Sequence, residues 1–364
     1  TPASLFATLS MFFLALLALT TAVKYPKAAN TWFSEVPADR VPQLSFDDYC
    51  RVGAHNMMYQ GHYLPAISHY RKFGYCSAEA FEVGKFLGRG AYGIVRLGRH
   101  IATGERVAIK FVRKSANEQR RFRKIRNEEC NMHRMQHPLI VKHFCTFIAG
   151  EEVAMVMELI KGEALVKIVR KPNEAEIRLR ERDRPFIIAQ LVVVLQYLHE
   201  QGIVFNDMRT KNTMILPNKR IKLIDFGLSV HTKAAPYADL SQPALPPLIR
   251  SKEDGEVDWE AMQQNLALDL QPKSIVDDWW HLGTLMYEMY TGIKPSWANP
   301  TQKHYVKYSL GMECPKEMPK RACELFQRLT DPQVDKRWGP TWNSLTLLKQ
   351  HSYFEGIDWS RLDK

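Results

Sequence analysis

The feature that most constrains the fold is a polar stretch, residues 205–212, enclosed between short apolar runs. It contains Asp207 and, five residues later, Asn212. The apolar run 213–216 follows it, and after a turn a second apolar run ends at Asp225. Alternating apolar segments around short polar turns predict a strand, a loop and a hairpin. Such a hairpin would bring the two carboxylates and the amide together.

Two Asp and one Asn in one place favour a particular chemistry. Their oxygens are ligands that a hard divalent cation prefers, and a carboxylate can also orient a hydroxyl for reaction. The alternative interpretation is an ordinary β-hairpin with polar turn residues. More distant motifs decide between the two.

A glycine pattern, Gly88-x-Gly90-x-x-Gly93, lies between two strand-like segments. Val95 follows the last glycine by two residues and begins another strand pattern instead of a helix. A Rossmann dinucleotide site needs a helix N-terminus at this point, so the pattern disfavours that site. It favours a glycine-rich hairpin whose backbone amides approach nucleotide phosphates without obstruction by Cβ atoms.

Taken together, these motifs resemble the eukaryotic protein kinase family over about residues 80–359. The family's catalytic loop usually reads His-Arg-Asp and is followed by a strand and Asp-Phe-Gly. This chain departs from that pattern at Phe205 and Asn206, which replace His-Arg, and at Arg209, which replaces Lys. The chain end resembles cyclic-nucleotide-regulated and related Ser/Thr kinases.

The resemblance implies an α+β, bilobal protein-kinase fold. It places a β-rich N-lobe at residues 80–158 and a helical C-lobe at residues 159–359. It also implies four catalytic residues: Asp207, Lys110, Arg209 and Glu128. Asp207 would accept the proton of the attacking hydroxyl, Lys110 would orient the phosphates, and Arg209 would neutralise charge on the γ-phosphate. Glu128 would pair with Lys110, with Glu129 as the second candidate.

The resemblance further implies ATP and Mg²⁺ as cofactors. Asn212 and Asp225 would hold the metal ion. The expected nucleotide pocket consists of Leu87, Gly88, Gly90, Gly93, Val95, Ala108, Lys110, Met157, Glu158, Leu159 and Met214. Residues 157–159 resemble the hinge that recognises adenine. Glu163 is a candidate for the ribose, although its register is one residue off.

Two further residues have structural roles in the family. Asp278, in the apolar segment that begins at Val276, matches the residue that braces the catalytic-loop backbone. Arg337 matches an Arg that normally pairs with the Glu of an Ala-Pro-Glu motif. That motif is not recognisable in the irregular segment 228–275, where the family usually shapes its substrate-binding site, so the sequence defines substrate specificity least.

The expected activity is transfer of the γ-phosphate of Mg-ATP to Ser or Thr hydroxyls of a protein substrate. A basic residue at position 209 favours Ser/Thr over Tyr. The alternative is a pseudokinase that acts as a nucleotide-binding regulatory or scaffold module. The full set of polar site residues argues against that alternative, because a scaffold does not need them. A small-molecule kinase is disfavoured by the protein-kinase-type C-lobe motifs.

The first 23 residues predict a hydrophobic signal peptide or a membrane anchor, and both alternatives remain open. Residues 3–23 carry no charge, and as a helix they would be roughly 30 Å long, enough to cross a bilayer. Residues 24–79 are expected to form a linker and an N-terminal extension. We therefore expect membrane association through residues 3–23, or a location in the secretory pathway or outside the cell. A hydrophobic leader before a divergent kinase domain also resembles secreted rhoptry-type kinases.

The charge and cysteine content exclude little. The net charge is +11, and the excess is spread along the chain, so we expect no specific nucleic-acid partner. None of the six cysteines forms a C-x-x-C pair, which disfavours a zinc site. Their even number permits disulfides in an oxidising compartment without requiring them.

Overall fold

The computed structural model describes residues 58–59, 62–63, 76–90, 93–113, 125, 128–132, 134–149, 152–231, 275–295, 313–331 and 334–363. The predicted leader 1–23 lies outside these residues, as does most of the extension 24–79. Among the described residues, no helix is both long and apolar enough to cross a membrane. The expectation of a membrane anchor therefore concerns a part of the chain that the structure does not describe.

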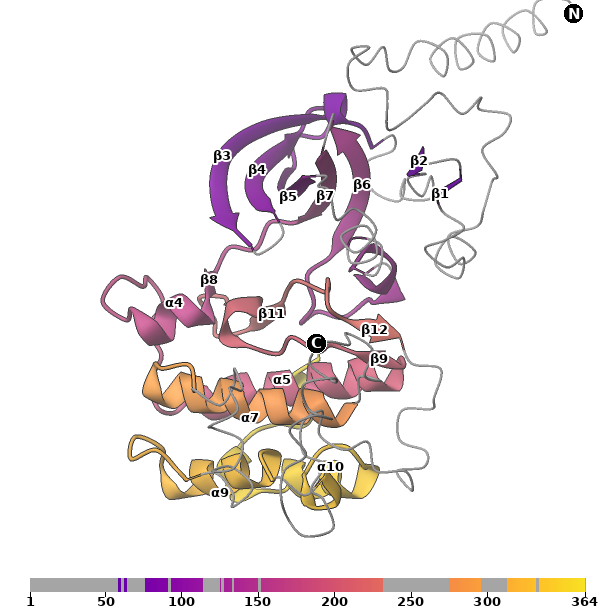
Figure 1. The fold of residues 1–364 in the computed structure, drawn as a ribbon. Helices are drawn as coiled ribbons and strands as arrows, with labels where there is room; N and C mark the ends of the chain where they lie inside the picture. The colour runs from indigo at the N-terminus through magenta and orange to yellow at the C-terminus, as the bar shows by residue number, and fades with distance from the viewer. Residues whose placement is uncertain are drawn as a thin grey trace, which may run out of the picture.

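The N-terminal lobe is a five-stranded antiparallel sheet (Figure 1). Its strands, in spatial order, are β3 (Phe81–Arg89), β4 (Ile94–His100), β5 (Arg106–Arg113), β7 (Glu152–Glu158) and β6 (His143–Ala149). The interior residues of β5 and β7 are buried on both faces, as expected for near-continuous apolar runs. The short helix η2 (Ala78–Ala80) leads into β3.

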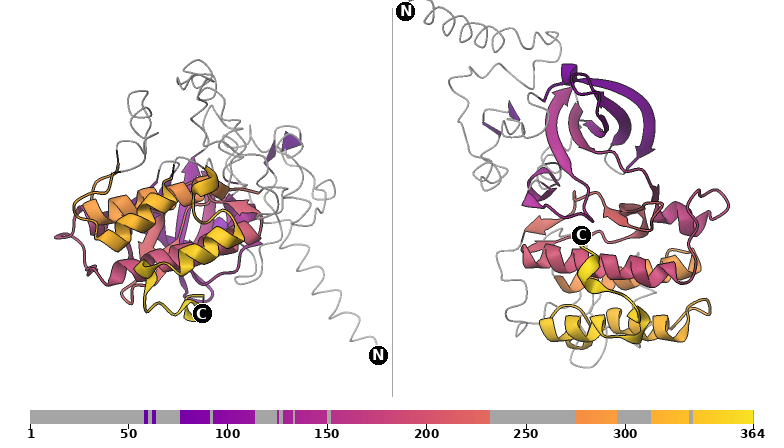
Figure 2. Two further views of the ribbon diagram at one scale, coloured as in Figure 1. Left: turned by 90° about the horizontal axis from the view of Figure 1, so that it is seen from below. Right: turned by 180° about the vertical axis from the view of Figure 1, so that it is seen from behind.

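The C-terminal lobe is built on two long helices, α5 (Asp183–Glu200) and α7 (Ile275–Thr291). Helix α5 is apolar almost all round, and a helix of that kind is stable only when neighbours cover every face. The right view in Figure 2 shows α5 and α7 side by side, with α9 and α10 as the next layer. One continuous hydrophobic core runs through these helices.

Five short strands lie before and after the long helix α5, and the polar loop 205–212 lies between β9 and β10. They are β8 (Glu163–Ala164), β9 (Ile203–Val204), β10 (Thr213–Ile215), β11 (Ile221–Leu223) and β12 (Val230–His231). β10 and β11 form the predicted hairpin, and β8 adds to its edge. β12 pairs with β9, so the chain returns to the start of the loop after Asp225.

The remaining elements complete the C-lobe and the described part of the N-terminal extension. They are β1 (Met58–Tyr59), β2 (His62–Tyr63), α4 (Leu165–Arg170), η3 (Thr210–Asn212), α9 (Lys320–Leu329), η5 (Val334–Lys336), α10 (Trp342–Lys349), η6 (Ser352–Phe354) and η7 (Trp359–Arg361). A small β-rich lobe and a larger helical lobe make up the two-lobed α+β architecture that the sequence predicted, which is confirmed.

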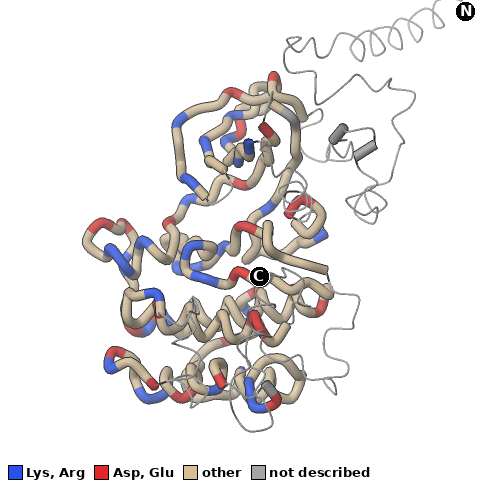
Figure 3. The backbone as a smooth tube through the Cα atoms, in the orientation of Figure 1, with Lys and Arg blue, Asp and Glu red and all other residues tan. Residues whose placement is uncertain are grey.

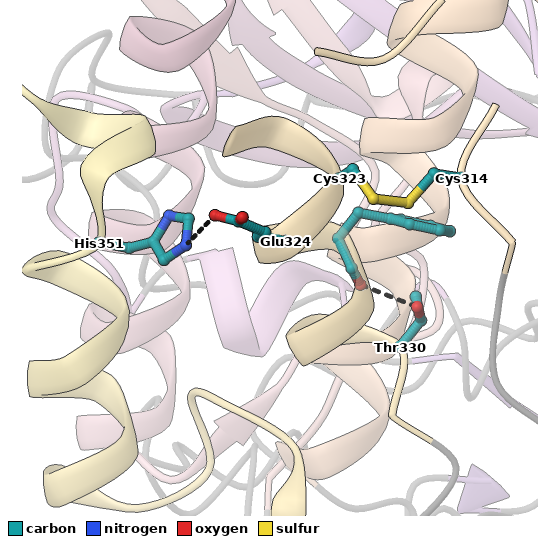
Figure 4. The surroundings of a disulfide bond; sticks show 6 residues. Cys314, Cys323, Glu324, Thr330 and His351 are labelled. Carbon is teal, nitrogen blue, oxygen red and sulfur yellow. Dashed lines mark hydrogen bonds and ion pairs between the residues drawn. A yellow bond between two sulfur atoms is a disulfide. The ribbon is translucent and has the colours of Figure 1, made fainter. Parts of the chain in front are cut away.

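Disulfide bonds are present in both lobes. Cys76 is bonded to Cys145, which ties the residues before η2 to strand β6. Cys314 is bonded to Cys323 on α9, close to the pair that His351 makes with Glu324 (Figure 4). Cys130 is also disulfide-bonded, to a partner outside the described residues. The cysteine count had left open whether disulfides form, and in the structure they do.

Candidate active site

The polar loop after β9 holds Asp207 and Asn212 in direct contact. The amide Nδ2 of Asn212 donates to the Asp207 carboxylate oxygen Oδ2 at 2.7 Å and to its backbone carbonyl at 3.0 Å. Arg209 Nε lies 3.1 Å from the other carboxylate oxygen, at an angle that makes this contact an ion pair and not a hydrogen bond. The loop thus fixes the Asp207 carboxylate from two sides.

Asp225 follows strand β11 and comes within reach of the N-terminal lobe. Its backbone φ is +66°, in the left-handed region, which Asp adopts more readily than most residues other than glycine. Its Oδ1 lies 3.0 Å from Nζ of Lys110 on β5. This ion pair therefore bridges the two lobes.

Lys110 is the centre of a buried charge network. Its Nζ donates to both carboxylate oxygens of Glu128, at 2.7 and 2.8 Å. Burial acts to lower the pKa of Lys110, but the carboxylates of Glu128 and Asp225 outweigh it and hold that pKa well above its usual value. The ammonium is therefore charged at neutral pH. Glu128, and not the alternative Glu129, is the partner.

Glu128 lies on a helix whose described residues are 125, 128–132 and 134. Besides the Lys110 network, a second contact joins this helix to the segment after Asp225. Asn131 Nδ2 donates to the hydroxyl of Ser229 at 2.7 Å, and this hydroxyl donates to the carbonyl of Phe226. These contacts fix the helix against the Asp225 segment, as the Lys110 network does. The sequence analysis had not singled out Asn131 or Ser229, because their pairing spans 98 residues.

Asp278 on α7 braces the start of the loop, and the predicted brace is present. Its carboxylate is fully buried and accepts hydrogen bonds from the backbone N–H groups of Phe205 and Asn206 at 2.8 and 2.7 Å. The His199 ring nitrogen Nε2 lies 2.8 Å from the same carboxylate. Three groups from α5 and the loop therefore converge on one side chain.

Asn206 occupies the position at which the family usually has Arg. Its φ is +64°, and Asn tolerates this conformation better than most residues. Its side-chain amide donates to the carbonyls of Val204 and Leu228, at 3.2 and 3.0 Å. A neutral side chain thus connects the loop to the segment after Gly227.

The strand register places Gly88 level with Lys110, two strands away in the same sheet. In the ladder, Gly88 is opposite Val95, and Val95 is opposite Lys110. A Cβ added at Gly88 would meet no protein atom within 4 Å, and one at Gly90 would meet only the Gly93 carbonyl at 3.9 Å. Packing among the described residues therefore does not require glycine at these two positions, and their backbone is open to a group from outside the protein.

Gly93 differs, because a Cβ there would lie 2.0 Å from the carbonyl oxygen of Phe111 on β5. We expect Gly93→Ala to lower the free energy of unfolding by about 1–3 kcal/mol, because the backbone of β4 or β5 must shift. The matched variant Gly88→Ala should change it by less than about 0.5 kcal/mol. Chemical denaturation of both proteins measures the difference, and equal losses would contradict this account of Gly93.

The other predicted pocket residues lie on or next to strands β3, β5, β7 and β10. Ala108 is opposite Met157 in the β5–β7 ladder, and both are almost fully buried. Met214 lies on β10 and is half-buried, as is Leu159, which follows β7. Leu87 is more exposed, at 41%. The Glu158 carboxylate is engaged by other protein groups, since it accepts from the Lys142 N–H and pairs with Lys222.

Glu163, the candidate for the ribose, is held by neighbouring protein groups. Its carboxylate accepts from the N–H of Ile177 at 2.7 Å and lies 2.5 Å from Nζ of Lys167. These bonds outweigh the effect of burial and lower its pKa below the usual value. In this structure, Glu163 supports the start of α4 and the segment after it.

Comparison with known proteins identifies the family. A family model described as the protein kinase domain matches residues 81–354. The chain belongs to the protein kinase family. It is 30% identical over 304 residues to a probable serine/threonine protein kinase, IRE4, of Arabidopsis thaliana. It is 26% identical over 302 residues to cAMP-dependent protein kinase type 3 of Saccharomyces cerevisiae and 29% identical over 304 residues to ribosomal protein S6 kinase alpha-6 of Danio rerio.

These matches cover about four fifths of the chain (79%, 82% and 81%), but differing shares of the relatives. The chain spans 29% of the Arabidopsis protein, 38% of the zebrafish protein and 70% of the yeast protein. The protein-kinase fold and the family are therefore those that the sequence predicted. The resemblance to rhoptry-type kinases stays a prediction.

Arg337, which in the family normally pairs with the Glu of Ala-Pro-Glu, contacts backbone carbonyls within the described residues. Its guanidinium is buried and donates to the backbone carbonyls of Asp331 and Val276. It also stacks over the Trp280 ring, 4.9 Å from the centroid. Burial lowers its pKa to about 10. The region of the expected Ala-Pro-Glu partner, residues 232–274, lies outside the described residues.

The residues present fit the nucleotide and metal that the family uses. Lys110 is charged and held by Glu128, Gly88 and Gly90 leave their backbone open, and Asp225 and Asn212 offer oxygen atoms of the kind that Mg²⁺ prefers. Phosphoryl transfer relies mainly on positioning and electrostatic stabilisation, which such fixed charges provide.

Proposed function

We propose that this kinase is active and transfers the γ-phosphate of Mg-ATP to Ser or Thr hydroxyls of proteins. The observation that carries the proposal is the linked set of polar groups: Glu128 holds Lys110, Lys110 reaches Asp225, and Asn212 holds Asp207. A scaffold does not need a buried cation held between two carboxylates, because burying charges is costly.

Each residue has a role in the proposed reaction. Asp207 accepts the proton of the attacking hydroxyl, and the Asn212 amide keeps its carboxylate in one orientation. Lys110 orients the nucleotide phosphates, and Glu128 prevents it from turning away. Asp225 and Asn212 would hold Mg²⁺. Bound Mg-ATP supplies the phosphoryl group.

Arg209 has two candidate partners in this scheme. It pairs with Asp207 in the structure, and in the reaction it would neutralise charge on the transferred phosphate. A planar guanidinium presents its charge differently from the usual Lys ammonium, so turnover need not match that of typical relatives. The Ser/Thr preference rests on this basic residue and on the printed names of the relatives.

The test is transfer of labelled phosphate from Mg-ATP to a mixture of acidic, neutral and basic protein substrates by the full chain. Transfer that disappears in Asp207→Asn would support an active kinase. Nucleotide binding without transfer by either protein would favour the pseudokinase alternative. In the same assay, Gly88→Ala should raise the KM for ATP, since its new methyl group enters the space open to the phosphates.

We also propose that the kinase works in an oxidising compartment, as the predicted leader suggests. Cys76–Cys145, Cys314–Cys323 and the bonded Cys130 support this, because structural disulfides persist mainly in secretory and extracellular settings. Non-reducing digestion of protein isolated from its own cells should release a cross-linked peptide that contains Cys76 and Cys145. Free thiols at both positions would argue for a reducing compartment.

A further inference from the structure

The helix that carries Glu128 and the segment that follows Asp225 meet at a buried pair of neutral side chains. Asn131 Nδ2 donates to the Ser229 hydroxyl at 2.7 Å, and Asn131 is 4% exposed and Ser229 0%. The Ser229 hydroxyl donates to the Phe226 carbonyl at 2.6 Å, and the same carbonyl accepts from the Ser229 N–H at 3.0 Å. Ser229 is therefore fixed within a tight turn and presents an acceptor to Asn131.

The pair lies close to the charged groups of the site on both elements. Asn131 is three residues after Glu128, a spacing that puts the two side chains on neighbouring positions of one helix face. Ser229 is four residues after Asp225. A Cβ on Gly227 would lie 3.4 Å from carboxylate oxygens of both Asp225 and Glu128, so the segment runs directly against the helix.

Two separate bridges thus join the same two elements. One is charged, since Lys110 Nζ contacts both Glu128 and Asp225. The other is the neutral Asn131–Ser229 hydrogen bond, which starts roughly 4.5 Å further along the helix axis. A helix held at one point can rotate about that point, whereas a second point of contact removes this freedom. The neutral bond therefore restrains the direction in which Glu128 points.

The segment is itself held against the loop that carries Asp207. The Phe226 ring packs edge-on against the Phe205 ring, with centroids 4.9 Å apart. The Asn206 amide donates to the Leu228 carbonyl, and the following strand β12 pairs with β9, which precedes the loop. The helix that bonds to this segment is thus positioned relative to the loop as well.

The link is neutral in a protein whose charged residues, of both signs, occur in both lobes (Figure 3). Neither the Asn131 amide nor the Ser229 hydroxyl titrates near neutral pH. Buried polar groups that lose their partner carry a free-energy penalty. A displaced helix would separate the two side chains, so the pair favours the docked helix independently of pH.

We propose that Asn131 and Ser229 are positioning residues for phosphoryl transfer. Their hydrogen bond keeps the helix in the orientation in which Glu128 holds the Lys110 ammonium. The inference rests on the proposed function, since it adds residues to the machinery of that same reaction. Both side chains act through Glu128 and Lys110.

Three variants of the full chain test the pair: Asn131→Ala, Ser229→Ala and the double variant. Each single change removes the shared hydrogen bond, so we expect kcat for transfer of labelled phosphate to fall about five- to tenfold. Ser229→Ala removes only one oxygen atom and therefore disturbs the packing least. The double variant should lose about the same factor, because the bond can be lost only once. Unchanged kcat in both single variants, or losses that multiply in the double variant, would overturn the proposal.

Thr330→Val is the matched control. The Thr330 hydroxyl is buried and donates to the Phe326 carbonyl at 2.8 Å, the same kind of bond that Ser229 makes with Phe226, but at the end of α9. We expect a loss of Tm similar to that of Ser229→Ala, while kcat stays within about twofold of the wild type. Equal losses of kcat in the two variants would show a structural role only and overturn the positioning role.

A measurement without turnover separates this inference from the proposed function. Hydrogen exchange followed by mass spectrometry reports on the backbone amides of helix residues 128–132 in the absence of nucleotide. Ser229→Ala should speed their exchange at least about fivefold, although Ser229 is 98 residues from Asn131, and Thr330→Val should leave it unchanged.

The two failures are then distinguishable. If no protein transfers phosphate but Ser229→Ala still speeds exchange in the helix, only the proposed activity is lost. If exchange in the helix is the same in Ser229→Ala and the wild type, the pair does not position the helix and the inference falls.

Discussion

Replacing Asp207 with Asn is expected to lower kcat for phosphate transfer about 10²- to 10⁴-fold, the usual contribution of a positioned general base. The side chain keeps its size, and its remaining carbonyl oxygen can still accept from the Asn212 amide. It loses the ability to accept a proton. Transfer of labelled phosphate to a protein substrate under single-turnover conditions measures the loss.

The same variant should bind Mg-ATP almost as well as the wild type, because Lys110, Glu128 and Asp225 are unchanged. A rise in Tm with Mg-ATP checks this binding, since a ligand at 100 times its Kd stabilises a protein by about 2.7 kcal/mol. The matched control is Asp335→Asn, at an exposed position in η5. Wild-type turnover in Asp207→Asn would contradict the assigned role of Asp207.

Replacing Asp278 with Asn is expected to lower the free energy of unfolding by about 3–5 kcal/mol. The carboxylate is fully buried and accepts from the Phe205 and Asn206 N–H groups, while His199 contacts it as well. The amide of Asn would point its own N–H group at backbone N–H groups, and two donors that face each other form no hydrogen bond. Chemical denaturation measures the loss, and a fall in kcat should accompany it, because the loop that carries Asp207 loses its anchor.

The neighbouring variant Asp277→Asn is the control for this prediction. It lies on the same helix, one residue away, and is only half-buried. We expect it to cost less than about 1 kcal/mol, in the range of partly exposed charge interactions. If the two variants were equally stable, Asp278 would not be the anchor that its contacts indicate.

Much of the fold could be predicted because local patterns encode it. The alternating strand patterns around Gly88–Gly93, the apolar run of α5 and the hairpin before Asp225 are visible in windows of 10 to 20 residues. The apolar runs on either side placed Asp207 in a loop, and the resemblance to the kinase family placed Lys110 on a strand.

The sequence could not predict which residues pair with one another across the fold. The sequence left Glu128 and Glu129 as alternatives. The side chains of two adjacent helical residues point to different faces of the helix, and only the packing of the helix against the sheet decides which of them faces Lys110. It left the cysteines unassigned, since six cysteines allow fifteen pairings. The Cys76–Cys145 bond spans 69 residues and depends on how β6 packs.

The sequence by itself thus determined the elements, the family and the candidate chemical groups, because these depend on residue type and short spacing. Only the tertiary structure decided how the groups are held. It set the left-handed backbone of Asp225 and Asn206, the anchoring of the loop by Asp278 and the close packing of Gly292 against Val169. These features require segments up to about a hundred residues apart to meet, and contacts of that range follow from the packing of the whole core, which no local window of sequence contains.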